Sequence, residues 1–230
     1  MSVTPGKFGE LLKSFMLKQI VQTPISKTAP IMLVERITDF ISLLFIAILG
    51  SYVFGIGELI IAGTSCFFIL LIIVLSNKSL AKPFFGLIHK IKFLVKYIDE
   101  FEEAYESAYI LLKPKPLVLM SLFSIVAWFF ECYGFYLILV KFNIEITMLW
   151  SSFTYAFATI LGSITMLPGG LGITDGSLTF MIMNHGIESD VAVASTFIIR
   201  VVTLWFAVLV GIISVSIYQR RFGEVIFEKN

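Results

Sequence analysis

Five long runs of hydrophobic residues divide the chain, with short polar turns or one long polar segment between them. A transmembrane helix needs about 20 consecutive, mostly apolar residues to cross a hydrocarbon core of ~30 Å. The pattern therefore predicts an all-α, polytopic transmembrane helix bundle. Its expected membrane segments are residues 31–54, 59–75, 117–140, 148–167 and 191–218.

A Pro-Gly-rich turn, PGGLGITDG, follows the fourth apolar run and precedes a short apolar stretch over residues 177–186. That stretch is too short to cross a bilayer comfortably, so it predicts a half-helix or a re-entrant element. The sequence leaves two arrangements open for this region, a re-entrant hairpin or two crossings. Either arrangement makes the fold a bundle with broken helices.

The one long polar segment covers residues 76–116 and contains both lysines and an acidic run. Its apolar residues recur every three and four positions over 82–105, which is typical of an amphipathic helix. We expect this helix to lie on the membrane face as a cytoplasmic connector. A solvated connector is the alternative.

Composition supports a membrane protein, with 58% hydrophobic and 14% charged residues. Soluble domains have about 45–50% apolar and about 25% charged residues. The net charge of +1 gives no field that would favour nucleic acid, so no nucleic-acid partner is expected. His89 and His185 are far apart and no metal-ligand spacing exists. Because no hydrolase, protease or nucleotide-binding motif is present either, we expect no metal, no cofactor and no enzyme activity.

Lysine and arginine residues predict the orientation, because they are enriched in cytoplasmic loops. They cluster in residues 1–27, in 76–116 and in the tail after residue 219, whereas the turn at 55–58 has none and the turn at 141–146 has one. The N-terminus, the long connector and the C-terminal tail are therefore expected to be cytoplasmic. The protein is expected in the plasma (cytoplasmic) membrane.

An internal repeat is suggested by two Pro-Gly-x-apolar-Gly motifs, Pro5–Gly9 and Pro168–Gly172. Arg36 follows the first motif at nearly the same interval as Arg200 follows the second, and each arginine lies inside an apolar run. The orientation above makes the two units inverted. We expect one membrane domain over 1–230, with a first repeat remnant at 1–75, the connector at 76–116 and a second repeat at 117–230.

Inverted repeats with broken helices are typical of transporters, whose substrate site lies at the repeat interface. A Pro-Gly break frees backbone N–H groups, and the helix that follows directs a positive dipole end toward a phosphate or carboxylate. Ionisable residues inside the membrane must face the bundle interior or a wet cavity. The candidate pathway residues are Pro5, Gly6, Lys7, Gly9, Glu10, Arg36, Asp39, Glu131, Pro168, Gly169, Gly170, Gly172, Asp175 and Arg200.

Structural roles compete with this functional interpretation. Glu131 and Arg200 could form an internal ion pair that fixes helix packing. Asp175 could cap the helix that begins after the Pro-Gly turn. Glu35 is a weaker pathway candidate because it is expected nearer the interface.

Four stretches resemble the lysylphosphatidylglycerol synthase transmembrane-region family, also called flippase-like membrane proteins: Thr4–Glu10 (TPGKFGE), Glu35–Asp39 (ERITD), Trp128–Glu131 (WFFE) and Leu167–Gly172 (LPGGLG). The likeness covers essentially the whole chain. One departure is Asp175, where the family often has glutamate. The other is at the amino end, since family members usually have membrane spans before the first Pro-Gly motif and this chain begins almost on that motif.

The resemblance implies a membrane protein that acts on lipids, since some members move an aminoacylated lipid across the bilayer and related domains accompany glycosyltransferases. The leading hypothesis is translocation of a phospholipid or lipid-linked polar headgroup, with membrane lipids as partners. One alternative is a non-catalytic anchor for a separate cytoplasmic lipid-modifying transferase. The other is a secondary transporter of small solutes.

Overall fold

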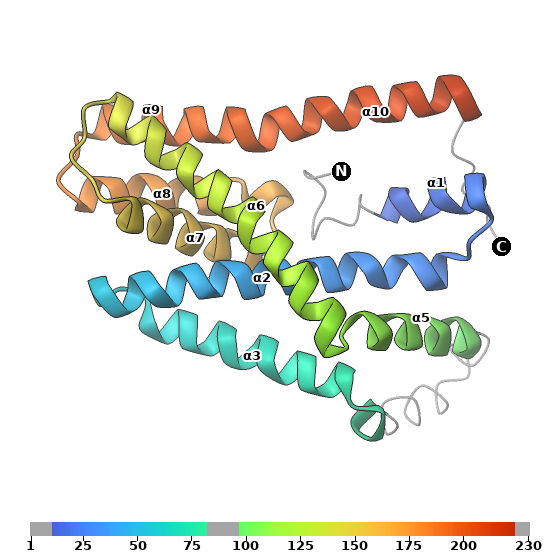
Figure 1. Ribbon diagram of the computed structural model, residues 1–230. Coiled ribbons are helices and arrows are strands. Elements are labelled where there is room, and N and C mark those ends of the chain that lie inside the picture. Colours follow the sequence, from blue (N-terminus) through green and yellow to red (C-terminus); the bar gives the residue numbers. More distant parts are fainter. Residues whose placement is uncertain (1–10, 82–96, 224–230) are drawn as a thin grey trace.

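The computed structural model describes residues 11–81 and 97–223, and within these ranges all regular secondary structure is helical. The predicted all-α bundle is therefore confirmed for the described part of the chain (Figure 1). The helices are α1 (Leu11–Val21), α2 (Ile25–Phe54), α3 (Glu58–Ser76), α5 (Ile98–Leu111), α6 (Pro114–Lys141), α7 (Met148–Ile164), η3 (Pro168–Gly170), α8 (Ile173–Asn184), α9 (Ser189–Arg200), η4 (Val201–Trp205) and α10 (Phe206–Phe222).

Four of the described helical segments are long and apolar enough to cross a membrane: α2, α3, α6 and the continuous α9–η4–α10. They coincide with four of the five predicted membrane segments. An even number of crossings returns the chain to the side on which it began. In agreement, the Tyr218 hydroxyl near the end of α10 donates to the Met16 carbonyl oxygen of α1, at 3.3 Å.

The remaining predicted segment, 148–167, forms the shorter helix α7, which ends at Ile164. Met166 has a positive φ of 53° and Leu167 is extended, so the helix cannot continue into Pro168. At 1.5 Å per residue, α7 is about 25 Å long, which is shorter than a ~30 Å hydrocarbon core.

Helices α7 and α8 form an antiparallel hairpin. The rings of Trp150 at the start of α7 and His185 just after α8 lie with centroids 4.3 Å apart, so both legs meet at one end of the molecule. The Pro-Gly turn forms the opposite tip, which lies near the middle of the bundle in Figure 1, while α2 continues past it. Of the two arrangements that the sequence left open, this geometry is that of a re-entrant hairpin.

The core is built where α7 packs against α2 on one side and α6 on the other. Leu43 and Ala47 of α2 are buried against Phe153 and Ile160 of α7. Gly50 allows this approach, because a Cβ added there would lie 2.3 Å from the Phe153 Cβ. The hairpin is thereby held inside the bundle, where its tip can form part of a site.

The described part of the connector docks on the bundle. Ala108 and Leu112, at the end of α5 and just after it, are buried with Val34 and Ile37 of α2. The ammonium group of Lys27 lies 3.2 Å from a Glu103 carboxylate oxygen. Residues 98–105 of the predicted amphipathic helix belong to α5, which packs on the bundle, and residues 82–96 lie outside the described residues.

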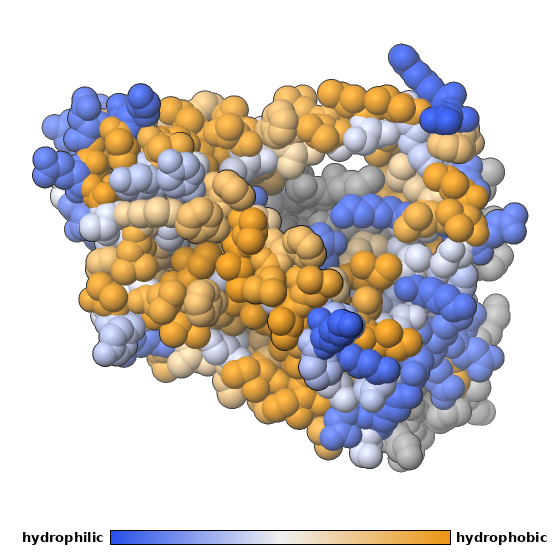
Figure 2. Space-filling model, viewed as in Figure 1, coloured by the Kyte–Doolittle hydropathy of each residue, from blue (hydrophilic) through white to orange (hydrophobic). Residues whose placement is uncertain are grey.

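Apolar side chains cover the middle of the visible face, and polar side chains gather toward its two ends (Figure 2). This distribution matches a bilayer that lies around the bundle. The first Pro-Gly motif, residues 5–9, lies outside the described residues, so the inverted repeat and the domain boundaries stay predictions.

Candidate functional site

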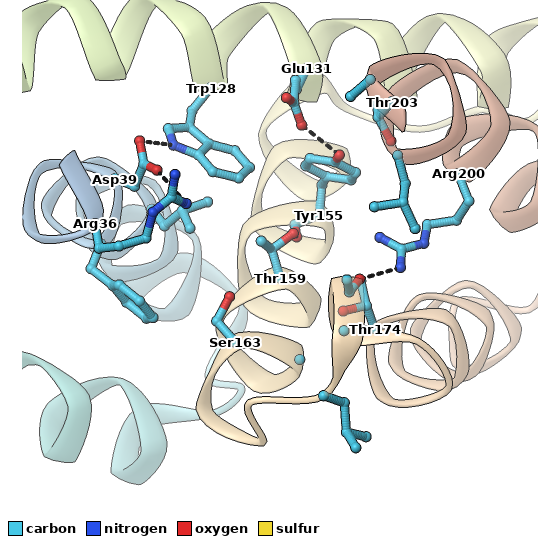
Figure 3. A pocket seen from close by; sticks show the side chains of 18 of the residues that line it. Arg36, Asp39, Trp128, Glu131, Tyr155, Thr159, Ser163, Thr174, Arg200 and Thr203 are labelled. Carbon is cyan, nitrogen blue, oxygen red and sulfur yellow. Dashed lines mark hydrogen bonds and ion pairs between the residues drawn. The ribbon is translucent and has the colours of Figure 1, made fainter. Parts of the chain in front are cut away.

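A cavity of about 340 Å³ lies between α2, α6, α7, the Pro-Gly turn and the junction of α9 with η4 (Figure 3). Pro168, Gly172 and Asp175 lie in or beside the same turn without lining the cavity themselves. Pro5, Gly6, Lys7, Gly9 and Glu10 lie outside the described residues. The predicted pathway residues that line the cavity are Arg36, Asp39, Glu131, Gly169, Gly170 and Arg200.

The first wall of the cavity carries an arginine–aspartate pair on α2. Arg36 Nη1 lies 3.0 Å from Asp39 Oδ2, which the i,i+3 spacing on one helix face allows. Asp39 Oδ1 also accepts hydrogen bonds from the Ser124 hydroxyl at 2.9 Å and the Trp128 indole N–H at 3.2 Å, both from α6. The carboxylate therefore joins α2 to α6 and orients the guanidinium.

The opposite wall carries Arg200, the last residue of α9. Its Nη2 donates to the Gly169 carbonyl oxygen at 2.5 Å, and its Nε lies 2.7 Å from Asp175 Oδ1. Asp175 Oδ2 accepts a hydrogen bond from the Gly172 backbone N–H at 2.9 Å. Asp175 thus caps the start of α8, and the structure pairs Arg200 with this residue across the turn.

One face of α7 forms the wall between the two arginines. The Tyr155 hydroxyl donates to Glu131 Oε2 at 2.7 Å. Thr159 and Ser163 follow on the same helix face and also line the cavity. These three residues were not among the predicted pathway residues, although their four-residue spacing places them as a polar stripe on one face of α7.

The backbone of the turn has an unusual conformation. Positive φ angles occur at Met166 and at three of its glycines, Gly169, Gly170 and Gly172. Glycine adopts such angles without the steric cost of a side chain, which explains the composition of the motif. Gly170 also lies close to Thr174, because an added Cβ would be 2.4 Å from the Thr174 hydroxyl oxygen.

A π-helical turn, η4, begins directly after Arg200 and contributes Thr203 and Leu204 to the cavity. Single π turns inside α-helices are frequent at functional sites. No feature of the sequence predicted this turn. Arg200, at the end of α9 and just before this turn, lies beside the tip of the α7–α8 hairpin.

The cavity is lined by charged side chains of both signs, Arg36 and Arg200 with Asp39 and Glu131. Guanidinium groups from two different helices converge on it, together with hydroxyl groups, in a region where most outward-facing side chains are apolar. Guanidinium donors suit phosphate and carboxylate oxygens. Across the described ranges, no group of three or more His, Cys, Asp or Glu residues could hold a metal ion.

Comparison with known proteins agrees with this architecture. The sequence model described as "Lysylphosphatidylglycerol synthase TM region" matches residues 1–211. The chain belongs to this family. The family resemblance expected from the four stretches is therefore confirmed, and the chain is a multi-pass membrane protein.

Curated relatives in this family are named UPF0104 membrane proteins. The chain is 25% identical over 223 residues to one from Methanocaldococcus jannaschii, covering 96% of this chain and 94% of the relative. It is 28% identical over 120 residues to one from Methanothermobacter thermautotrophicus, covering 52% of this chain and 36% of that relative. A relative from Pyrococcus horikoshii is 25% identical over 237 residues, with 91% and 71% covered. No solved structure matches the chain.

Proposed function

We propose that this membrane protein translocates a phospholipid, or a lipid-linked polar headgroup, between the two leaflets of a membrane. The observation that carries the proposal is the placement of Arg36 and Arg200 on opposite walls of one polar cavity inside an apolar bundle. A lipid has a matching polar and apolar part. Its charged headgroup needs a polar path across the membrane, whereas its acyl chains do not.

In the proposed mechanism the headgroup phosphate enters the cavity and accepts hydrogen bonds from the guanidinium groups. The hydroxyl groups of Thr159 and Ser163 provide further polar contacts along α7. The acyl chains remain in the bilayer, against the exposed apolar side chains of the bundle. The protein replaces the water that the headgroup loses, which lowers the cost of crossing a medium where unpaired polar groups are strongly disfavoured.

The remaining parts of the proposal follow from the charge distribution and the family. We place the protein in the cytoplasmic membrane with α1, the 76–116 connector and the end of α10 on the cytoplasmic side, since lysine and arginine concentrate in these segments. Its partners are membrane lipids. The chain supplies binding groups rather than catalytic ones, because the family description refers to a membrane region.

The test is leaflet exchange of labelled phosphatidylglycerol, and separately of an aminoacylated lipid, in proteoliposomes. Exchange by the wild-type chain should fall at least about tenfold in Arg36→Gln and Arg200→Gln, since each removes a charged donor from the headgroup path. Arg220→Gln is the matched control, because this arginine is exposed at the end of α10, away from the cavity. All variants must first show the wild-type elution volume and melting behaviour.

Other results would favour the alternatives. If no folded variant, wild type included, exchanges lipid but the chain retains a lipid-modifying transferase at the membrane, the anchor hypothesis gains support. If a small solute accumulates regardless of lipid identity, the protein is a solute transporter. Unchanged exchange in both cavity variants would contradict the proposed path.

A further inference from the structure

The guanidinium group of Arg200 already contacts an anionic side chain of the same protein, that of Asp175. Its guanidinium lies against the Asp175 carboxylate, with an Nε to Oδ1 distance of 2.7 Å, and its side chain is only 13% exposed. The other carboxylate oxygen accepts from the Gly172 N–H at 2.9 Å. One carboxylate thus bridges a guanidinium and a backbone N–H at the start of α8.

This combination of groups is an anion site in chemical terms. A helix N-terminus presents N–H donors and a positive dipole end, and an arginine beside it adds a charge-assisted donor. Helix α8, which has 12 residues, provides the helix N-terminus, and α9 provides the arginine. The cavity reaches the same place, because Arg200, Gly169 and Gly170 all line it.

We propose that Asp175 occupies the position that the substrate's phosphate takes at Arg200, and that the phosphate must displace it. This inference rests on the proposed function and names the anion subsite and the residue that sets its affinity. Asp175 is attached to the site, so it competes at a high effective concentration. A phosphate group presents several acceptor oxygens, so it can engage Arg200 and the freed Gly172 N–H together.

Displacement also releases the tip of the hairpin. Arg200 holds Gly169 through its carbonyl oxygen and holds Gly172 through Asp175, so one side chain fixes both sides of the turn. At both of these glycines, and at Gly170 between them, the backbone φ is positive. An anion that takes over the guanidinium therefore frees the tip, and the tip moves as the headgroup passes.

The first experiment measures binding of glycerol phosphate to the full chain in detergent, by calorimetry and by thermal stabilisation. Asp175→Asn should bind it about tenfold more tightly than wild type, because the competing charge is gone. Arg200→Gln should lose binding. Asp190→Asn is the matched control, since it removes the same charge from the first turn of α9, at an exposed position outside the cavity.

A purely structural Asp175 predicts the opposite sign, because loss of the cap would loosen the site and weaken binding. Equal or weaker binding by Asp175→Asn, or no binding by either protein, overturns the inference. These measurements need no transport. Tighter binding by Asp175→Asn with no lipid exchange would support the anion subsite and contradict the proposed translocation. Lipid exchange without tighter binding would support translocation and contradict the anion subsite.

The second experiment follows the tip itself. Met166, which is 71% exposed, is replaced in the chain by cysteine in a Cys66→Ser background, and Cys132 is buried enough to stay silent. Glycerol phosphate should raise the rate of maleimide reaction at position 166 several-fold. In the Arg200→Gln variant the cysteine at position 166 should react fast both with and without glycerol phosphate. A rate that glycerol phosphate leaves unchanged or lowers contradicts the displacement of Asp175.

Discussion

Gly162 of α7 and Thr174 of α8 face each other across the hairpin without room for another carbon atom. A Cβ added to Gly162 would lie 1.9 Å from the Thr174 hydroxyl oxygen and 3.4 Å from the Cα of Gly170. The two legs of the hairpin therefore approach closely just below the tip, and this contact fixes where the Pro-Gly turn enters the cavity.

Gly162→Ala is expected to destabilise the protein by about 1–3 kcal/mol, because overpacking forces the two helices apart. Thr174→Ala in the same chain should restore part of that loss, since it removes the oxygen atom that the new methyl group meets. Thermal unfolding in detergent measures both. Gly63→Ala is the control, because no atom lies within 4 Å of a Cβ added there. Equal effects of the two glycine substitutions would argue against the close contact.

Asp39→Ala is expected to lower stability by about 1–3 kcal/mol, because the donors of Ser124 and Trp128 lose their acceptor and Arg36 loses one of its ion-pair partners. Ser124→Ala should cost less, since the carboxylate keeps its other partners. The double variant Arg36→Ala/Asp39→Ala should be more stable than the sum of the single effects predicts, because that sum counts the loss of the Arg36–Asp39 contact twice. Strict additivity in chemical unfolding would show that the pair does not interact.

Hydropathy predicted the crossing helices well because the bilayer imposes a length and a composition on each of them. At 148–167 the same signal left a re-entrant hairpin and two crossings open, because an apolar run of nearly sufficient length ends there in a break. Arg36 lies beside Asp39 because the two are three residues apart on α2, a contact that helical spacing allows but that was not among the predictions.

Relations between distant segments were not accessible in this way. The sequence offered Glu131 as a partner for Arg200, whereas the structure pairs Arg200 with Asp175, which only the folding of the hairpin brings near. Tyr155, Thr159 and Ser163 were missed because hydroxyl side chains also occur elsewhere in the same run, at positions 151, 152 and 154, so these three did not stand out. The π turn after Arg200 depends on packing around it and has no local sequence signal.

The contact between α2 and α5 should weaken in acid. A hydrogen bond from the Ser26 hydroxyl, and then the nearby Lys27 ammonium group, lower the pKa of Glu103 below its ordinary value of 4.5. A lowered pKa in the folded state stabilises the contact above the ordinary value, and that contribution is lost as pH falls through the lowered pKa. Hydrogen exchange in α5 should accelerate in that range.

Glu103→Gln should show faster exchange in α5 already at neutral pH and a smaller response to acid. Glu102→Gln is the control, since its side chain is exposed on the same helix. If both substitutions leave the acid response unchanged, the pairing of Glu103 with the start of α2 does not hold α5 in place.

The hairpin geometry requires that Lys115 and Gln219 lie on one side of the membrane and Glu58 and Glu145 on the other. α7 and α8 enter and leave at the same end, so they add no net crossing to those of α2, α3, α6 and the α9–α10 segment. Each of the four residues, all exposed, is replaced by cysteine in a Cys66→Ser background. An impermeant maleimide should label positions 58 and 145 in intact cells, and positions 115 and 219 only after the membrane is opened. Labelling of 115 and 219 from opposite sides would contradict the hairpin, whereas labelling of all four with the sides exchanged would reverse the proposed orientation and leave the fold intact.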